Sequence, residues 1–362
     1  MKTVLEPATS SPEQLPGIRN EDGRDAQQNS GPVFVIGMWR SGTSLFYALL
    51  NQHPDIALMY EGDLLLLRPV FWLPGAGSRF AGRWQFWNQA ISRHKIEPER
   101  LASGSSSFRE NLESAYREAA RQKGARLFGE KSPNYYDAVL ELARDFPEAR
   151  FIVIWRDPAA ISRSILDAAK GRSSWFTRRG MIVRTLLGFK VMKNQCDRAV
   201  RQGVHIHQVQ YEEFVQDPAR TMSEVCRFLG VPFFPEMASL QSADRSAIYE
   251  GRHHSLVQGK EIIPSRSAER GETLPLRIRK KIDRYMALWR KQTHGAWPPP
   301  SQGTEGLNPE LPSLLERFVD ACAYRYFRSF DSAVSILYSY APFSALRVWR
   351  RLVHSSHVEV GE

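Results

Sequence analysis

The residues best suited to chemistry form a glycine-bounded loop near the N-terminal end, GMWRSGTS at positions 37–44. The loop follows the apolar run 33–36 and opens a segment in which leucines recur at helical spacing. Backbone N–H groups converge in such a strand–loop–helix turn, and the N-terminus of the helix adds partial positive charge. The loop is therefore predicted to bind an anion such as a phosphate group.

The composition of the loop narrows the choice of anion. Gly37 and Gly42 match the G-x-x-x-x-G of nucleotide P-loops, in which Lys and then Ser or Thr follow. Here Thr43 and Ser44 follow, so the Lys that contacts the β- and γ-phosphates is absent, and the loop carries Arg40 instead. Such a loop suits a 5′-phosphosulfate, which needs no bridging magnesium. The alternative is a generic tight turn between a strand and a helix.

Two further segments place polar residues after apolar runs. Arg156-Asp157-Pro158 follows the run 151–155, and Ser164 comes eight residues after the arginine. If a helix begins at Pro158, Ser164 lies on its second turn, so that Arg156 and Ser164 can reach one phosphate. The run 204–211 ends at Tyr211, which either contacts a nucleotide or packs on the helix that follows.

Taken together, these segments resemble the sulfotransferases that use 3′-phosphoadenosine 5′-phosphosulfate (PAPS). RSGTS at 40–44 with LLNQHP at 49–54 is similar to their 5′-phosphosulfate segment, and Arg156 with Ser164 is similar to their 3′-phosphate segment. The likeness is greatest to the bacterial branch related to tyrosylprotein sulfotransferases, and it spans roughly residues 32–297. The resemblance implies PAPS as cofactor, bound by Arg40, Ser41, Gly42, Thr43, Ser44, Arg156, Ser164 and Tyr211, with Ser265 and Arg266 in a lid over the nucleotide.

The resemblance also implies catalytic residues. Glu61 is the expected general base, because it follows a short apolar segment and lies at the family's spacing from Arg40. Arg40 and Lys131 are expected to stabilise negative charge, with Glu130 orienting Lys131. The alternatives are that Glu61 and Lys131 are ordinary surface residues. His53 and His94 are weaker candidates for the base.

These residues need a framework of parallel strands. Apolar runs at 33–36, 56–59, 127–128, 151–155 and 204–211 alternate with segments of helical period. Continuously apolar strands bounded by helices predict a parallel sheet buried on both faces. The predicted fold class is α/β, a P-loop-type three-layer fold with a central parallel sheet flanked by helices. A helical insertion and a helical C-terminal appendage are expected in addition.

The domain organisation follows from composition along the chain. We expect a disordered leader at 1–30, a catalytic domain at 31–291 with a helical acceptor-side insertion at 64–126, a linker at 292–312, and an aromatic and basic tail at 313–362. The tail either packs on the domain, which is the favoured interpretation, or lies on an anionic membrane surface. No leader sequence for secretion is recognised in residues 1–30.

Charge and cysteine content limit the partners. The net charge of +10 points to an anionic partner, and no DNA- or RNA-recognition motif accompanies it. Three widely separated cysteines indicate neither a disulfide framework nor a metal site. We therefore expect no metal and no nucleic acid, and a cytoplasmic location, either free or at the inner face of the membrane. The sequence leaves the oligomeric state open. The predicted function is transfer of a sulfo group from PAPS to a hydroxyl of a glycan, a glycolipid or another small acceptor; the alternative is a P-loop kinase or ATP-binding protein.

Overall fold

The computed structural model describes residues 31–91, 96, 107–170, 180–248, 257, 274–293 and 310–354. The expected leader, most of the expected linker, Ser265, Arg266 and His94 lie outside the described residues. What the sequence indicates about them therefore stays a prediction.

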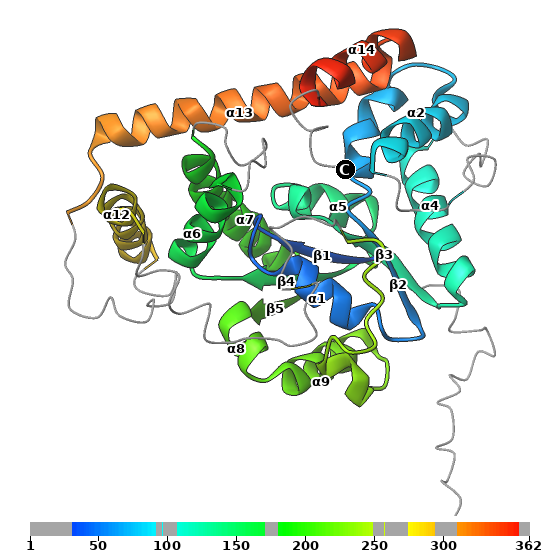
Figure 1. Cartoon of the computed structure of the whole chain (residues 1–362), viewed down its shortest axis with the longest axis horizontal. Coiled ribbons are helices and arrows are strands. Elements are labelled where there is room, and N and C mark those ends of the chain that lie inside the picture. Colours follow the sequence, from blue (N-terminus) through cyan, green and yellow to red (C-terminus); the bar gives the residue numbers. More distant parts are fainter. Residues whose placement is uncertain are drawn as a thin grey trace, which may run out of the picture.

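Five parallel strands form one sheet in the order β2-β3-β1-β4-β5 (Figure 1). Their bounds are Val33–Gly37 (β1), Ile56–Tyr60 (β2), Leu127–Lys131 (β3), Arg150–Trp155 (β4) and His205–Gln210 (β5). All four neighbouring pairs run parallel, so the carboxyl ends of the strands share one edge of the sheet. The predicted α/β class with a central parallel sheet is confirmed.

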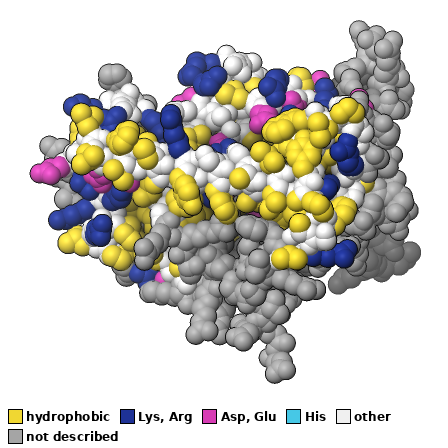
Figure 2. All heavy atoms as spheres, turned by 90° about the horizontal axis from the view of Figure 1, so that it is seen from above, with side chains coloured by type: hydrophobic (Ala, Val, Ile, Leu, Met, Phe, Trp, Pro, Cys, Tyr) yellow, Lys and Arg dark blue, Asp and Glu magenta, His cyan; other side chains and the backbone are white. Residues whose placement is uncertain are grey.

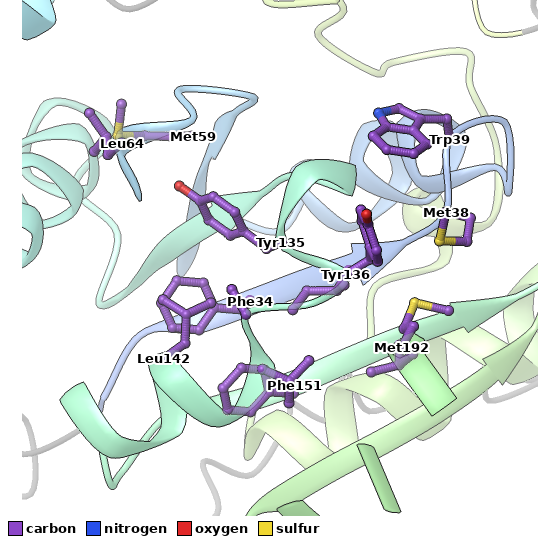
Figure 3. Packing of buried hydrophobic residues seen from close by; sticks show 14 of the residues in the cluster. Phe34, Met38, Trp39, Met59, Leu64, Tyr135, Tyr136, Leu142, Phe151 and Met192 are labelled. Atoms are coloured by element: carbon purple, nitrogen blue, oxygen red, sulfur yellow. The ribbon is translucent and has the colours of Figure 1, made fainter. Parts of the chain in front are cut away.

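Apolar residues bury both faces of this sheet. Every residue of β1, β2 and β3 is buried, as a parallel sheet covered by helices requires. Successive residues of a strand point to opposite faces, so that Val33 and Phe34 belong to two different hydrophobic clusters. Figure 3 shows the cluster around Phe34, whose ring centroid lies 5.4 Å from that of Phe151 and 6.3 Å from that of Tyr135. The strands that carry the candidate site are thus held rigidly.

Helices cover both faces and complete three layers. The cluster on one face receives residues of α1 (Thr43–Leu50), α8 (Tyr211–Gln216), α9 (Pro218–Leu229) and the 3-10 turn η3 (Pro235–Ala238). The cluster on the other face receives residues of α4 (Phe108–Lys123), α5 (Val139–Asp145), α6 (Pro158–Lys170), α7 (Met181–Arg201) and α12 (Leu276–Gln292). The described part of the expected insertion contains the 3-10 helix η1 (Leu64–Trp72), α2 (Ala76–Ile91) and α4. A short turn, η2 (Pro133–Tyr135), follows β3.

The C-terminal tail forms a long helix, α13 (Leu314–Tyr340), followed by α14 (Phe343–His354). α13 contacts η1, α2 and α7, and in Figure 1 it runs along one side of the molecule above them. The phenol of Tyr324 lies 3.0 Å from that of Tyr136, and Asp331 forms an ion pair with Arg184 of α7. The tail therefore packs on the domain, in line with the favoured interpretation of the sequence.

The outward side of α13 is unusually apolar. Figure 2 looks onto this side of the molecule and shows hydrophobic side chains gathered along it. Leu314, Leu315, Phe318 and Tyr326 are between 67% and 79% exposed. Among the described helices, none has the length and hydropathy needed to span a membrane.

Candidate active site

The loop between β1 and α1 has a backbone that only glycine permits at two points. A Cβ on Gly37 would lie 2.5 Å from the hydroxyl oxygen of Ser41, so the loop closes tightly there. Gly42 has φ +96, and a Cβ there would lie 2.2 Å from the ring of Tyr211. Arg40 adopts φ 70, a left-handed conformation that non-glycine residues rarely adopt. The loop is thus held in a specific, strained shape, which is common where a ligand is held.

This loop presents free hydrogen-bonding groups. Gly42 is the N-cap residue of α1, and no side chain caps the first N–H groups of the helix. The hydroxyl of Ser41 is fully buried and has no hydrogen-bond partner. Buried polar groups are normally paired, so an unpaired hydroxyl beside an uncapped helix N-terminus fits a phosphate- or sulfate-bearing ligand.

Two arginines and a serine from distant segments meet at the loop. The Nε of Arg40 donates to the hydroxyl of Ser164, with a distance of 3.0 Å. Arg156, at the end of β4, donates from Nη1 to the backbone carbonyl of Arg40 at 2.8 Å. Its guanidinium lies 4.1 Å from the ring centroid of Tyr211, which also covers Gly42. The residues expected to hold the two ends of PAPS are therefore assembled at one edge of the sheet.

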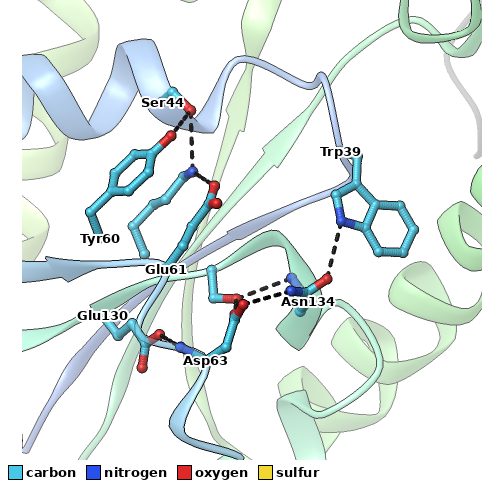
Figure 4. A network of polar contacts seen from close by, with 9 residues as sticks. Trp39, Ser44, Tyr60, Glu61, Asp63, Glu130 and Asn134 are labelled. Carbon is cyan, nitrogen blue, oxygen red and sulfur yellow. Dashed lines mark hydrogen bonds and ion pairs between the residues drawn. The ribbon is translucent and has the colours of Figure 1, made fainter. Parts of the chain in front are cut away.

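Two of the three expected catalytic residues, Glu61 and Lys131, meet beside Ser44 (Figure 4), whereas Arg40 contacts Ser164. Lys131, at the end of β3, forms an ion pair with Glu61 and donates to the hydroxyl of Ser44 at 3.2 Å. Its ammonium lies 4.1 Å from the ring centroid of Tyr60, whose phenol is 2.7 Å from Ser44 Oγ. The Lys131 side chain is 1% exposed and that of Glu61 19%, so neither is an ordinary surface residue. Their catalytic roles stay predictions.

His53, a weaker candidate for the base, has a structural role. Its ring is buried, its Nε2 lies 2.9 Å from the carbonyl of Pro232, and its Nδ1 accepts from the N–H of Asp55 at 3.0 Å. Burial lowers the pKa of His53. With both ring nitrogens engaged, His53 joins the turn after α1 to the segment at Pro232 and is not available to an acceptor.

Sequence reasoning missed a buried polar network behind Glu61. The carboxylate of Asp63 accepts from Ser132 Oγ at 2.6 Å and from Asn134 Nδ2 at 2.9 Å, and Asn134 Oδ1 accepts from the indole of Trp39 at 3.1 Å. In the sequence, Asp63 and Asn134 look like solvated loop residues. The only available signal was their position three residues after the ends of β2 and β3.

Glu130 has a different role from the one expected. Instead of orienting Lys131, its carboxylate accepts from the phenols of Tyr116 at 2.6 Å and Tyr135 at 2.7 Å, and from the backbone N–H of Asp63 at 2.6 Å. Neighbouring residues of a strand point to opposite faces, which separates the Glu130 side chain from that of Lys131. Burial, followed by the charge of Asp63, raises the pKa of Glu130 to about 8. Burial, followed by the charge of Glu61, raises the pKa of Asp63 to about 6.

The fold and the loop define a class of protein. A parallel α/β sheet whose carboxyl edge carries a glycine-bounded loop, an uncapped helix N-terminus and two arginines is built to bind a polyanionic ligand such as a nucleotide. Within the described residues, no group of His, Cys, Asp and Glu is arranged to hold a metal ion.

The chain belongs to the sulfotransferase family, whose model matches residues 32–236. Protein-tyrosine sulfotransferase 1 of Danio rerio is 26% identical over 208 residues, covering 56% of this chain and 53% of the relative. Nodulation protein NoeE of Sinorhizobium fredii is 30% identical over 142 residues, covering 39% of this chain and 31% of that protein.

A solved structure supports the fold. The sulfotransferase domain from the curacin biosynthetic pathway superposes with a TM-score of 0.51 at 19% identity, covering 75% of this chain and 99% of that domain. The chain spans about half the length of the tyrosine sulfotransferase it matches. The family and the fold are thus established, and the sulfo donor and the acceptor are proposed below.

Proposed function

We propose that this protein is a PAPS-dependent sulfotransferase that transfers a sulfo group to a hydroxyl of a glycan, a glycolipid or another small acceptor. One observation supports PAPS as the sulfo donor. The hydroxyl of Ser41 is buried without a hydrogen-bond partner next to the uncapped N-terminus of α1, and Arg40 and Arg156 lie beside it. A ligand with negative groups at both ends fits this arrangement, because its charges would meet N–H groups and guanidinium groups.

Two groups of residues would bind the two ends of PAPS. The segment from Ser41 to Ser44, with Arg40, would hold the 5′-phosphosulfate, and Arg156 with Ser164 would hold the 3′-phosphate. When bound, PAPS supplies the sulfo group that is transferred. The alternative of an ATP-dependent kinase has less support, because the loop lacks the Lys that contacts terminal phosphates and the family is one of sulfotransferases.

Glu61 is positioned to act on the acceptor. It lies at the carboxyl edge of the sheet with part of its carboxylate open to solvent, where it can accept the proton of an acceptor hydroxyl. Lys131 and Arg40 bring positive charge to the same edge, where negative charge develops during transfer. The ion pair with Lys131 also fixes the direction in which the Glu61 carboxylate points.

Donor binding is tested by thermal stabilisation with the product nucleotide, 3′-phosphoadenosine 5′-phosphate, in comparison with ATP and magnesium. A ligand that binds only the folded state raises its stability, so we expect the 3′-phosphate nucleotide to raise the Tm more than ATP with magnesium. Arg156→Ala should weaken this binding by about 10- to 100-fold, because a charged hydrogen-bond donor is lost. Arg163→Ala, which removes an arginine paired with Asp167 within α6, is the matched control. Stabilisation by ATP with magnesium alone would refute the proposal.

The acceptor is sought with labelled PAPS and pooled glycans, glycolipids and tyrosine peptides. Tyrosine peptides are included because relatives are protein-tyrosine sulfotransferases. Glu61→Gln should keep nucleotide binding and lose turnover by about 100-fold or more, as expected for a general base. Normal turnover by Glu61→Gln would assign the proton transfer to another group.

We also propose that α13 rests on an anionic membrane surface, such as the inner face of the cytoplasmic membrane. The three acids of α13, Glu316, Asp320 and Asp331, are each paired with basic side chains of α12 or α7. The exposed charged residues of α13 in the described structure are Arg317 and Arg325, beside the exposed leucines and aromatics. A face with apolar and cationic side chains but no exposed acid complements an anionic bilayer.

Co-sedimentation with phosphatidylcholine vesicles, with and without phosphatidylglycerol, tests this proposal. We expect binding to the anionic vesicles, reduced about tenfold or more by Phe318→Asp because an inserted apolar side chain is lost. Leu276→Asp is the matched control, since Leu276 is 66% exposed but lies at the start of α12. Equal binding by wild type and Phe318→Asp, or no binding by the wild type, would refute it.

A further inference from the structure

The turn after β2, which carries the proposed base Glu61, has an unusual backbone conformation with positive φ angles. Glu61 and Asp63 have φ 48 and φ 51, and with Arg40 they are the non-glycine residues of the described chain with positive φ. Such conformations cost free energy and persist only where the surroundings enforce them. Something must therefore hold the Glu61–Asp63 turn in place.

Asp63 supplies the strongest contacts that hold it. Its side chain is buried, and its carboxylate accepts two hydrogen bonds from the segment after β3, from Ser132 Oγ and Asn134 Nδ2. Its own N–H donates to Glu130 of β3 at 2.6 Å. One residue thus ties the turn that carries Glu61 to the strand and loop that carry Lys131 (Figure 4).

The network continues to the loop after β1. The indole N–H of Trp39 can only donate, and it donates to Asn134 Oδ1. The Asn134 amide nitrogen must then face Asp63, so position 63 must accept at that point. Ser132 Oγ also donates to position 63, so this position must accept two hydrogen bonds, which the two oxygens of a carboxylate do and a single amide oxygen does not. Trp39 immediately precedes Arg40. The chain of hydrogen bonds therefore reaches the loop between β1 and α1, which we call the donor loop because we propose that it binds the sulfo donor PAPS.

The charge state of Asp63 agrees with this role. Burial raises its pKa to about 6, so the carboxylate is mostly ionised at neutral pH despite being buried. A buried charge is costly unless it is fully hydrogen-bonded. Two donors to its side chain, and the ammonium of Lys131 nearby, satisfy that requirement.

We propose that Asp63 is a positioning residue that locks the loops after β1, β2 and β3 together and so holds Glu61 in register with the donor loop. The inference rests on the proposed function, because it takes Glu61 as the base. Asp63 itself need not touch the acceptor or the donor; it acts through the backbone of Glu61 and through Asn134.

An exchange of the two side chains tests the proposal. Asp63→Asn has one acceptor oxygen where the carboxylate has two, so position 63 can no longer accept from both Ser132 Oγ and Asn134 Nδ2. The double variant Asp63→Asn with Asn134→Asp restores a donor and an acceptor at each link. We expect the single variant to lose about 10- to 100-fold in kcat, because a displacement of about 1 Å in a reacting group has that effect. The affinity for 3′-phosphoadenosine 5′-phosphate and the KM for PAPS should change by less than about twofold. The double variant should recover most of the kcat.

Two readouts separate positioning from simple loss of stability. Thermal melts show whether each variant is folded at the assay temperature. The indole N–H resonance of Trp39, assigned by its loss in Trp39→Phe, should move in Asp63→Asn and return in the double variant, with no acceptor required. An unmoved resonance, a kcat of Asp63→Asn equal to that of the wild type, or no recovery in the double variant would each overturn the role of Asp63. Failure of the wild type to bind 3′-phosphoadenosine 5′-phosphate would instead overturn the proposed function.

Discussion

Replacing the buried Glu130 by Gln should change how the stability of the protein depends on pH. Glu130 is fully buried, and its carboxylate meets two phenols and one backbone N–H. Burial, followed by the charge of Asp63, raises its pKa from 4.5 to about 8. At neutral pH Glu130 in the folded protein is therefore mostly protonated, so one of the two phenols accepts its proton instead of donating. Gln can present the same combination of one donor and one acceptor to these groups.

The size of the effect follows from linkage. Between about pH 4.5 and 8, the folded state binds a proton at Glu130 that the unfolded state has released, so stability falls as pH rises. The slope is about 1.4 kcal/mol per pH unit in that window and flattens above the folded pKa. From about pH 6.5 to about pH 8.5, the loss is roughly 2 kcal/mol. Asp63, with a pKa of about 6, is already mostly ionised over this range and adds little.

Urea denaturation at several pH values between those limits measures the effect. The free energy of unfolding of the wild type should fall relative to that of Glu130→Gln by roughly 2 kcal/mol across the range, since all other titrating groups are shared. Glu236→Gln, at an exposed position, should run parallel to the wild type. Parallel curves for wild type and Glu130→Gln would mean that Glu130 is ionised in the folded protein and that the assigned cause is wrong.

Two further substitutions test the loop and the tail. Gly42→Ala should weaken nucleotide binding about tenfold or more, because the added Cβ would meet the Tyr211 ring. Gly203 has a similar φ but open space around it, so Gly203→Ala should leave nucleotide affinity unchanged. Thermal shift with the nucleotide measures both. Phe327→Ala should lower the free energy of unfolding by about 3 kcal/mol, because it removes a buried ring. Tyr326 lies on the same helix and is 69% exposed, so Tyr326→Ala should lower it by under about 0.5 kcal/mol. Urea denaturation measures both. Equal effects within either pair would contradict the assignment.

Much of the framework could be predicted because its signals are local. Strands β1, β2 and β4 are short apolar runs, and buried parallel strands need no alternation of polar residues. β5, at the edge of the sheet, is less apolar, with the sequence HIHQVQ. The glycines of the donor loop and the pair Arg156 and Ser164 lie at spacings that a strand end and a helix turn determine. These features were therefore visible without knowledge of any long-range contact.

The polar network could not be predicted because its bonds join residues far apart. Asp63 and Ser132 are 69 positions apart, and Tyr116 and Glu130 approach each other from a helix and a strand. In a sequence, an aspartate beside a glycine looks like a solvated turn. The expected orientation of Lys131 by Glu130 failed for a related reason, since strand neighbours face opposite sides of the sheet.

The long helix α13 also affects the order in which the molecule can be completed during synthesis. It contacts η1, α2 and α7, which all precede it in the chain, and Tyr324 reaches the segment after β3. Chains emerge from the ribosome N-terminus first, so the sheet and donor loop are available for folding before α13 appears. The contacts of α13 with η1, and of Tyr324 with Tyr136, therefore form only in this late, non-local docking step. A nascent chain can thus form the loop between β1 and α1 before α13 completes the packing around η1.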